Sequence, residues 1–411
     1  MRRFDDSGRL DRLLARNAVS MAQIEAFAAA VANAHRSAEV AAGDNPYVAV
    51  SHRIQPALDN FTHLRPLVTD AAQSRQLTAL EQWTQQYSER LAPIFEQRAR
   101  HGAVRECHGD LHTENLAWWH DQPLMFDCIE FNADLRWIDV MSDVAFLIMD
   151  LRFRGHADFA HRFLNVYLSA TGDYGGLQVL RYFETYRAMV RAKVATLRAT
   201  QPDISHDDAR TQRALCAAYM DLALQCIRTP APRLVLMFGL SGSGKSVVAQ
   251  SLADRTGAIV LRSDVERKRL FGLAATAASG STQDQGIYTA SAHDATHQRL
   301  YDLARDIIRS GYTAIVDATF LKQTRRNTFA QLAHELGVPL NIVSCRAPEA
   351  VLRQRVRQRA AAANDASEAN EDVLQQQLSH HDPLTDVERA ITIDIDTAAP
   401  WDADAIAAQL I

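Results

Sequence analysis

The stretch GLSGSGKS, residues 239–246, decides the fold of the second half of this 411-residue chain. It matches the pattern G-x-x-x-x-G-K-[ST], follows the apolar run RLVLMFGL and precedes the helical pattern SVVAQSLADRTG. Its glycines, Gly239, Gly242 and Gly244, allow the backbone to turn so that successive N–H groups point toward one phosphate. A helix that begins near Lys245 adds the positive end of its dipole. The stretch therefore predicts a phosphate-binding loop between a strand and a helix, rather than a plain glycine-rich turn.

Side chains in and after this loop extend the prediction to nucleotide and metal binding. Lys245 is expected to neutralise the β and γ oxygens of ATP, and the Ser246 hydroxyl to hold Mg²⁺. Asp317 ends the apolar run AIVD and is expected to bind the same ion through water, although a strand-end turn would also accommodate it. The predicted nucleotide-binding residues are Gly239, Ser241, Gly242, Ser243, Gly244, Lys245 and Ser246, and the predicted metal ligands are Ser246 and Asp317.

Asp264 and Arg267 follow the second predicted strand, in RSDVERKR. Open α/β sheets bind ligands beyond such strand ends. Asp264 is expected to take the proton of an acceptor hydroxyl, and Arg267 to hold a phosphate or the acceptor. The alternative is a plain helix start, because Ser263 and Glu266 have the spacing of a capping box.

Four arginines recur along one predicted helix in two i,i+4 pairs: Arg353 with Arg357, and Arg355 with Arg359. Guanidinium groups that close over a triphosphate would stabilise the charge of the transferring phosphoryl group. A solvated helix face explains the same arginines equally well. The Ala-rich stretch after Arg359 suits a moving lid.

The arrangement of predicted elements divides the chain at TPAPR, residues 229–233, which is the expected linker. Residues 234–411 alternate apolar strands with helices, a pattern typical of a parallel sheet with helices on both faces. Residues 1–228 are expected to be mostly helical, with a long helix that Pro93 breaks. Short strands are predicted at AVREC, NLAWWH and PLMFDCI, and helices resume at WIDVMSDV. The predicted fold class is α/β.

Composition limits the partners and the compartment. Hydrophobic residues make up 47% of the chain, charged residues 23%, and the net charge is −5, so no global field favours nucleic acid or an anionic membrane. No 18-residue apolar run predicts a membrane span. The five cysteines are scattered and form no CxxC pair, which argues against a disulfide framework or a structural zinc site and favours a reducing cytoplasm. The Ala- and Arg-rich usage suggests a bacterial source.

Residues 233–411 resemble the P-loop small-molecule kinases, which include gluconate kinase, chloramphenicol phosphotransferase, polynucleotide kinases and zeta-type toxins. The stretches RSDVERKRL, VDATF and CRAPEAVLRQRVRQR carry this resemblance, in addition to the phosphate loop. It implies a P-loop NTPase-type fold and an acceptor-activating carboxylate at Asp264 with Arg267 beside it. The further site residues that it implies are Arg326, Arg355 and Arg359.

The first half carries HGDLHTEN, residues 108–115, then FDCIEFN and DVMSDVAFLIMDL. In these stretches it resembles the aminoglycoside-phosphotransferase-like fold, related to the C-lobe of protein kinases, and bacterial predicted kinases fuse it to a P-loop domain in this order. The match implies a catalytic carboxylate at Asp110 and Mg²⁺ ligands at Asn115 and Asp127. Residues 1–107 contain no lysine and no G-x-G-x-x-G, so the small nucleotide lobe is expected to be missing. We therefore interpret these three residues as a vestigial or incomplete site.

Together these patterns predict a cytoplasmic kinase that uses ATP and Mg²⁺ to phosphorylate a hydroxyl of a small molecule in its C-terminal half. Two alternatives stay open: a toxin-like kinase of nucleotide sugars or nucleic-acid ends, and a non-catalytic ATP-binding regulator. The acidic net charge and the lack of a basic stripe argue against nucleic acid. No motif identifies the acceptor.

Overall fold

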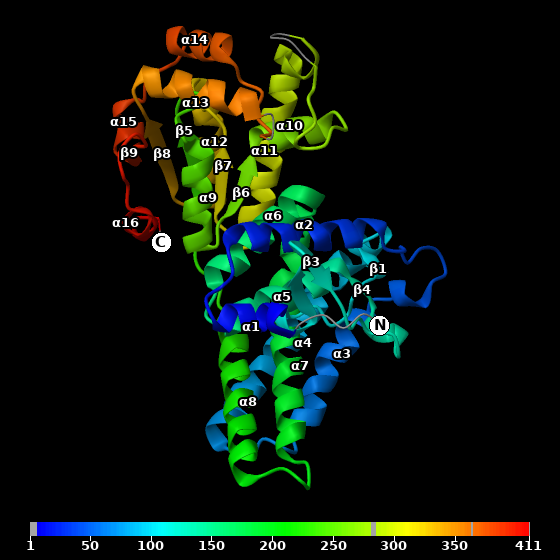
Figure 1. Cartoon of the computed structure of the whole chain (residues 1–411). Helices are drawn as coiled ribbons and strands as arrows, with labels where there is room; N and C mark the ends of the chain where they lie inside the picture. Colours follow the sequence, from blue (N-terminus) through cyan, green and yellow to red (C-terminus); the bar gives the residue numbers. More distant parts are fainter. Residues whose placement is uncertain (1–5, 281–284, 363–364, 411) are drawn as a thin grey trace. The chain divides into compact units, whose positions relative to one another are not determined.

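The computed structural model describes residues 6–280, 285–362 and 365–410 (Figure 1). The chain divides into two compact units, Met1–Thr229 and Pro230–Ile411, called unit 1 and unit 2 below. Each has its own hydrophobic core, and together they make the α/β fold that the sequence predicts.

Unit 1 is mostly helical and contains two small antiparallel sheets, in which β1 pairs with β4 and β2 with β3. The predicted strands AVREC and NLAWWH contain β1 and β2, and PLMFDCI contains all of β3 except its first residue, Gln122. In chain order the α-helices and strands are α1 (Leu10–Ala15), α2 (Met21–Ser37), α3 (Ser51–Leu64), α4 (Ala71–Arg100), β1 (Val104–Glu106), β2 (Leu116–Trp119), β3 (Gln122–Met125), β4 (Trp137–Asp139), α5 (Val140–Phe153), α6 (Ala157–Thr171), α7 (Leu177–Ala199) and α8 (His206–Cys226).

Two sequence predictions about unit 1 were wrong. Pro93 does not break the helix, because α4 runs through it and buries Leu91 and Phe95 on either side, so packing outweighs the backbone hydrogen bond that proline cannot make. The helix expected from Trp137 begins only at Val140, since the preceding residues pair with β1 as strand β4. The side chain of Asp139 then caps α5 by accepting a hydrogen bond from the next turn.

The core of unit 1 is built around α5, in which every residue from Val140 to Leu151 is buried. A helix that is apolar on all sides must be covered on all sides, and α6 and α7 pack against α5. Phe146 and Met149 of α5 join a cluster to which α3, α4, α7 and α8 also contribute. This packing holds fixed the start of α5, which lies beside the loop after β1.

The described residues of unit 2 form one sheet of five parallel strands in the order β6-β7-β5-β8-β9, as the alternation of apolar strands with helices predicts. The helices α9 and α16 pack together on one face, and α11 and α12 lie on the other (Figure 1). In chain order the elements are β5 (Leu234–Phe238), α9 (Lys245–Thr256), β6 (Ile259–Arg262), α10 (Ser263–Leu270), α11 (Ala290–Arg309), β7 (Ala314–Asp317), α12 (Gln323–Leu336), β8 (Leu340–Arg346), α13 (Glu349–Ala362), α14 (Glu371–Ser379), α15 (Asp386–Arg389), β9 (Thr392–Asp396) and α16 (Ala403–Ala408).

The sheet of unit 2 places three functional segments at one edge. Because all the strands are parallel, the carboxyl ends of β5, β6 and β7 lie at the same edge. The phosphate-binding motif follows β5, Asp264 follows β6, and Asp317 ends β7. Ligands of open parallel sheets bind beyond this edge, so the fold brings together what the sequence separates.

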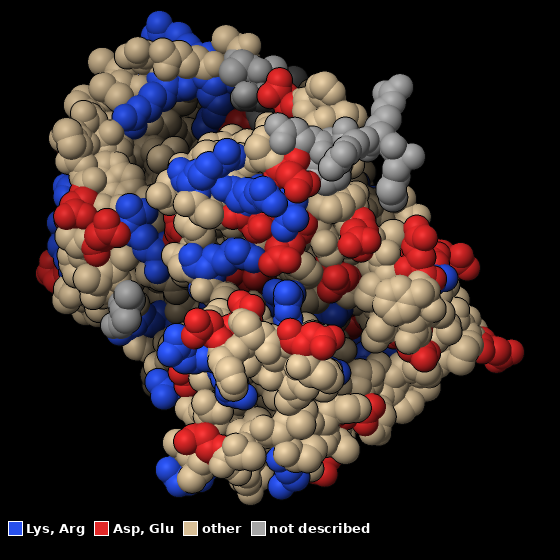
Figure 2. Space-filling model, turned by 60° about the horizontal axis from the view of Figure 1, so that its bottom comes forward, with Lys and Arg blue, Asp and Glu red and all other residues tan. Residues whose placement is uncertain are grey.

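The surface of the described residues is mixed in charge. On the face drawn in Figure 2, lysine and arginine side chains are interspersed with aspartate and glutamate. Among the helices of the described residues, none combines the length and the apolar character needed to cross a membrane.

Candidate functional site

The loop between β5 and α9 has a backbone shape that requires glycine. Gly239, Gly242 and Gly244 have φ angles of 148°, 83° and 84°, which L side chains rarely adopt. A Cβ on Gly242 would also lie 2.7 Å from the carbonyl oxygen of Leu352 in α13. Glycine therefore permits both the turn and the close approach of α13 to the loop.

The last two residues of the motif begin α9 and interact with the loop and with β7. Lys245 is buried, and its Nζ donates to the Leu240 carbonyl at 2.8 Å. Burial lowers the pKa of Lys245, and the Asp317 carboxylate opposes this shift. Ser246 Oγ donates to Asp317 Oδ2 at 2.6 Å. Burial raises the pKa of Asp317, although the hydrogen bond from Ser246 and the charge of Arg262 oppose it.

The contact between Ser246 and Asp317 fits the predicted metal site. A hydroxyl and a buried carboxylate that touch supply the hard oxygen ligands that Mg²⁺ prefers. The structure thus brings together the two residues that the sequence assigned to the metal, and that assignment stays a prediction.

Polar groups of the loop fit an anionic ligand. The Ser241 amide donates to the side-chain oxygen of Gln377 in α14 at 2.8 Å. Ser243 Oγ is buried and has no hydrogen-bond partner among the described residues. A buried hydroxyl without a partner is costly, and a phosphate oxygen would satisfy it. In this structure the Gln377 side chain therefore accepts the hydrogen bond of an amide that we expect to donate to phosphate.

Asp264 and Arg267 lie one turn apart on α10, and both line the cavity beyond the sheet edge. Arg267 is buried, donates from Nη1 to His293 Nδ1 at 3.0 Å, and lies over the Tyr288 ring at 5.1 Å. Its Nε is buried and has no partner among the described residues. A buried guanidinium with an unused donor suits an anionic ligand.

The cavity also contains a histidine that sequence reasoning missed. His297 lines it from α11, and burial lowers the pKa of His297 to about 4, with help from the charges of Arg325 and Arg267. Its Nδ1 is buried and has no partner among the described residues. His293 lies four residues earlier on α11 and lines the same cavity, so the i,i+4 spacing of two histidines was the available signal.

The arginines of α13 divide between two environments. Arg355 donates to Gly242 O at 3.3 Å and to Thr397 O at 2.7 Å, so it braces the phosphate loop. Arg359 donates to Ala369 O at 3.0 Å, and both arginines line the cavity.

The other two arginines of α13 fit the alternative of a solvated face. Arg353 donates to Glu349 at 2.7 Å, and Arg357 pairs with Glu371. Neither lines the cavity. Arg355 and Arg359 thus line the cavity and the other two do not, while the catalytic role of Arg355 and Arg359 stays a prediction.

Arg326 is not part of this cavity, contrary to what the family resemblance implied. Its side chain is 1% exposed and forms a bidentate pair with Glu388 at 2.6 and 3.1 Å. Its remaining donors bind three main-chain carbonyls, those of Phe320, Asp382 and Pro383. With its donors all used, Arg326 ties α12 to the segment before α15.

The cavity itself has a volume of about 740 Å³. The phosphate loop, α10, α11 and the segment from α13 to α14 line it. Side chains also connect two of its walls: Arg262 Nη2 lies 3.1 Å from Asp365, and Lys268 Nζ lies 3.1 Å from Glu368. These ion pairs tie residues 365–368 to the end of β6 and to α10.

The loop after β1 in unit 1 forms a second, smaller arrangement. Asn115 Nδ2 donates to Asp110 O at 2.9 Å and to Asp110 Oδ2 at 3.0 Å. His112 Nε2 lies 3.3 Å from the same carboxylate oxygen. Burial acts to raise the pKa of Asp110, but the hydrogen bond and charge of His112 outweigh it, so the pKa lies below its ordinary value.

Asp127, the third residue of the predicted vestigial site, is exposed and has a φ angle of 60°. A residue other than glycine in this region costs about 1–3 kcal/mol. The preceding residue, Phe126, donates its amide to Asn115 O at 3.1 Å, which ties the end of β3 to the loop. Ahead of β1, the elements that the structure describes from Asp6 onward are helices, so this part contains no strand-rich nucleotide lobe.

Comparisons with known protein families agree with this division. Residues 7–181 match the model described as "Phosphotransferase enzyme family", and residues 234–384 match the model described as "AAA domain". The chain is a fusion of a phosphotransferase domain with a P-loop kinase domain. It is therefore an enzyme of the phosphotransferase class, with kinase-type domains in both halves.

Curated relatives match most of this chain. Uncharacterized proteins of Mycobacterium tuberculosis (strain H37Rv) and Mycobacterium bovis are 27% identical over 369 residues, which is 89% of this chain and 72% of theirs. They extend the similarity across both units without naming a substrate.

Solved structures are similar to less than half of this chain. A gluconokinase from Sinorhizobium meliloti 1021 is 25% identical, with a TM-score of 0.29, over 44% of this chain and 89% of that protein. A sugar kinase from Janibacter sp. HTCC2649 is 23% identical, with a TM-score of 0.32, over 44% of this chain and 92% of that protein. Likenesses of this extent identify no substrate.

Proposed function

We propose that the protein is an ATP-dependent kinase that phosphorylates a hydroxyl of a small molecule, with the chemistry in unit 2. The observation that carries this proposal is the cavity of about 740 Å³ into which the phosphate loop, Asp264 and Asp317 all open. Its size is that of small-molecule sites. Nucleotide-binding and acceptor-binding groups therefore line one space, as in-line transfer requires.

The loop and α9 bind the triphosphate of the nucleotide. On binding, Lys245 exchanges its bond to the Leu240 carbonyl for phosphate oxygens, and the Ser241 amide exchanges Gln377 for the same ligand. Ser246 and Asp317 hold the metal ion. Mg²⁺ bound there neutralises charge on the phosphate oxygens.

The acceptor binds on the side of α10. Asp264 accepts the proton of the attacking hydroxyl, which makes it the general base. The buried Arg267, with its unused Nε, supports an acceptor that carries a carboxylate or phosphate group. Arg359 from α13 stabilises the charge of the transferring group, and Arg355 supports the loop from the same helix.

Unit 1 contributes no independent turnover in this proposal. Its Asp110 carboxylate is bonded to Asn115 and lies beside His112, and the described residues before β1 supply no covering lobe. Catalysis by positioning requires both sides of the site. We place the domain boundary in residues 229–233, next to the division between the two compact units.

The state of the thiols supports the proposed compartment. All five cysteines of the chain are free, which supports the reducing cytoplasm that we propose as the compartment.

The test is a metabolite screen with γ-labelled ATP, in which wild type, Lys245→Ala and Asp110→Ala are assayed in parallel. We expect a labelled small molecule from wild type and Asp110→Ala, and none from Lys245→Ala. A protein that binds ATP but labels nothing would be a regulator. Label that survives Lys245→Ala but not Asp110→Ala would place the chemistry in unit 1.

A further inference from the structure

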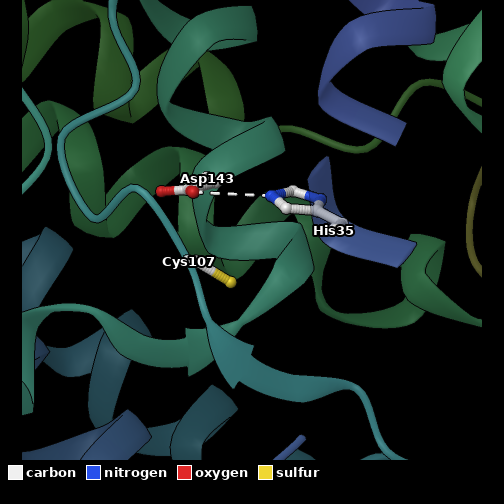
Figure 3. Close-up of side chains that lie close together, drawn as sticks. All are labelled: His35, Cys107 and Asp143. Carbon is white, nitrogen blue, oxygen red and sulfur yellow. Dashed lines mark hydrogen bonds and ion pairs between the residues drawn. The ribbon is translucent and has the colours of Figure 1, made fainter. Parts of the chain in front are cut away.

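A group of metal-ligating side chains lies in the interior of unit 1, and the kinase proposal does not use it. His35 comes from the end of α2, Cys107 follows β1, and Asp143 lies in the first turn of α5 (Figure 3). The three are 5%, 8% and 0% exposed. One ligand atom from each lies within 4.8 Å of the other two.

The spacing of the histidine and the carboxylate is that of two ligands around an ion. His35 Nε2 lies 3.4 Å from Asp143 Oδ2. A charge-assisted hydrogen bond would be about 2.7–2.9 Å long. Two ligands each about 2.1 Å from a tetrahedral zinc ion lie about 3.4 Å apart. The observed distance is that of a long hydrogen bond, and it is also the distance expected for two ligands of one ion.

Neighbouring groups orient both ligands. His35 Nδ1 lies 2.9 Å from the Tyr167 hydroxyl, so an Nδ1–H can donate there and leave the Nε2 lone pair toward Asp143. The Asp143 carboxylate accepts the amides of His108 at 2.9 Å and Gly109 at 3.0 Å. Outer hydrogen bonds of this kind are typical of histidine and carboxylate ligands of metals.

The buried charge of Asp143 favours a bound cation, in addition to the two backbone amides, His35 and the more distant charge of Arg187 that already act on it. Its carboxylate is fully buried, and within the part of the chain that the structure describes, His35 is its only ion-pair partner. A buried carboxylate needs a close positive charge to offset the loss of hydration. The Cys107 sulfur has only a weak contact, to Ile138 O at 3.7 Å, and is available as a ligand.

We propose that His35, Cys107 and Asp143 bind one Zn²⁺ ion in unit 1. A nitrogen, a sulfur and an oxygen ligand suit this borderline-soft ion. All three residues line a cavity of about 200 Å³, which has room for a water molecule as the fourth ligand. Binding releases the thiol proton of Cys107, because the thiolate is the ligand.

The ion would join three segments that are distant in the sequence. It links α2 to α5 and to the residue that precedes His108, while Asp143 also holds the amides of His108 and Gly109. Occupancy would therefore stabilise the loop that carries Asp110. The role is structural, and it is independent of the P-loop chemistry of unit 2.

The experiment uses the full chain and Co²⁺ as a spectroscopic probe, followed by competition with Zn²⁺. Wild type should take up one equivalent of Co²⁺ with a sulfur-to-cobalt charge-transfer band, and Zn²⁺ should remove that band. Cys107→Ser should lose the band, and His35→Gln should bind Co²⁺ at least about 10-fold more weakly. Cys128→Ser is the matched control, because Cys128 lines the same cavity but is exposed.

Two results would overturn the zinc proposal. One is a wild type that binds no stoichiometric Zn²⁺ in competition with a chromophoric chelator, a measurement that needs no variant to fold. The other is a band that survives Cys107→Ser and disappears in Cys128→Ser. Circular dichroism of each variant establishes that a lost band does not reflect a lost fold.

Discussion

The phosphate loop of unit 2 and the loop after β1 in unit 1, residues 108–115, both carry side chains typical of kinase active sites. The two loops differ in their surroundings. The first opens into a cavity of about 740 Å³, which a lysine, several carboxylates and four arginines line. In the loop after β1, the Asp110 carboxylate accepts a hydrogen bond from Asn115 and lies beside His112. Catalytic residues alone do not make a site, because transfer also needs groups that hold the nucleotide and exclude water.

The largest expected effect contrasts these two loops directly. Lys245→Ala should lower kcat by about 10³-fold or more, because it removes the charge that stabilises the transferring phosphoryl group. Asp110→Ala should leave kcat within about 2-fold of wild type, since unit 1 does no chemistry in this proposal. Steady-state ATP turnover with the identified acceptor measures both. Equal losses in the two variants would remove the contrast between the loops.

Asp264→Asn should come next, with a loss of about 10²–10⁴-fold in kcat, the usual contribution of a general base. Nucleotide affinity should stay close to that of wild type, because Asp264 is proposed to contact the acceptor. Turnover and nucleotide titration on the same preparation separate these effects. If Asp264→Asn keeps full turnover, Asp264 is not the general base and serves only at the start of α10.

The two arginine pairs of α13 offer a matched test of which face of the helix serves the cavity. Arg359→Ala should lower kcat by about 10–100-fold, whereas Arg357→Ala, on the same helix and paired with Glu371, should stay near wild type. Single-turnover rates with saturating nucleotide provide the measurement. If the two variants have the same rate, Arg359 does not contribute to catalysis although it lines the cavity.

The smallest effect concerns the stability of unit 2 against pH. Burial lowers the pKa of His297 to about 4 from 6.5, so below pH 6.5 the unfolded chain binds a proton that the folded chain does not. Stability should therefore fall as the pH drops from about 6.5 toward 4, by up to a few kcal/mol. Denaturant unfolding of wild type and His297→Asn at pH 7 and pH 5 tests this. The variant should lose less stability than wild type between these two values.

The sequence was sufficient where the chemistry is local. Eight consecutive residues form the phosphate loop, so their backbone needs could be deduced without knowing any neighbour. The alternation of apolar strands with helices in unit 2 predicted the parallel sheet. Asp317, at the end of one of its strands, accepts a hydrogen bond from Ser246 at 2.6 Å. Parallel strands fix where their ends meet, which is why this much was predictable.

The sequence was insufficient where a side chain depends on a distant partner. The family resemblance implied Arg326 as a site residue, but its donors all bind Glu388 and three main-chain carbonyls. The arginines of α13 look alike in sequence, and only the packing of the helix on the loop separates Arg355 and Arg359 from the other pair. Periodicity shows that residues share a face, but it does not identify what that face contacts.

What the sequence by itself determined is the phosphate loop, the strands of the sheet and the presence of two kinase-type halves. Only the tertiary structure decided which side chains come together in the cavity of unit 2 and in the interior of unit 1. The buried group of His35, Cys107 and Asp143 is the clearest case. His35 and Asp143 are 108 residues apart in the chain, and no ligand spacing indicates that they meet. Local backbone geometry follows from nearby residues, whereas side chains from separate helices meet only because the core packs those helices together.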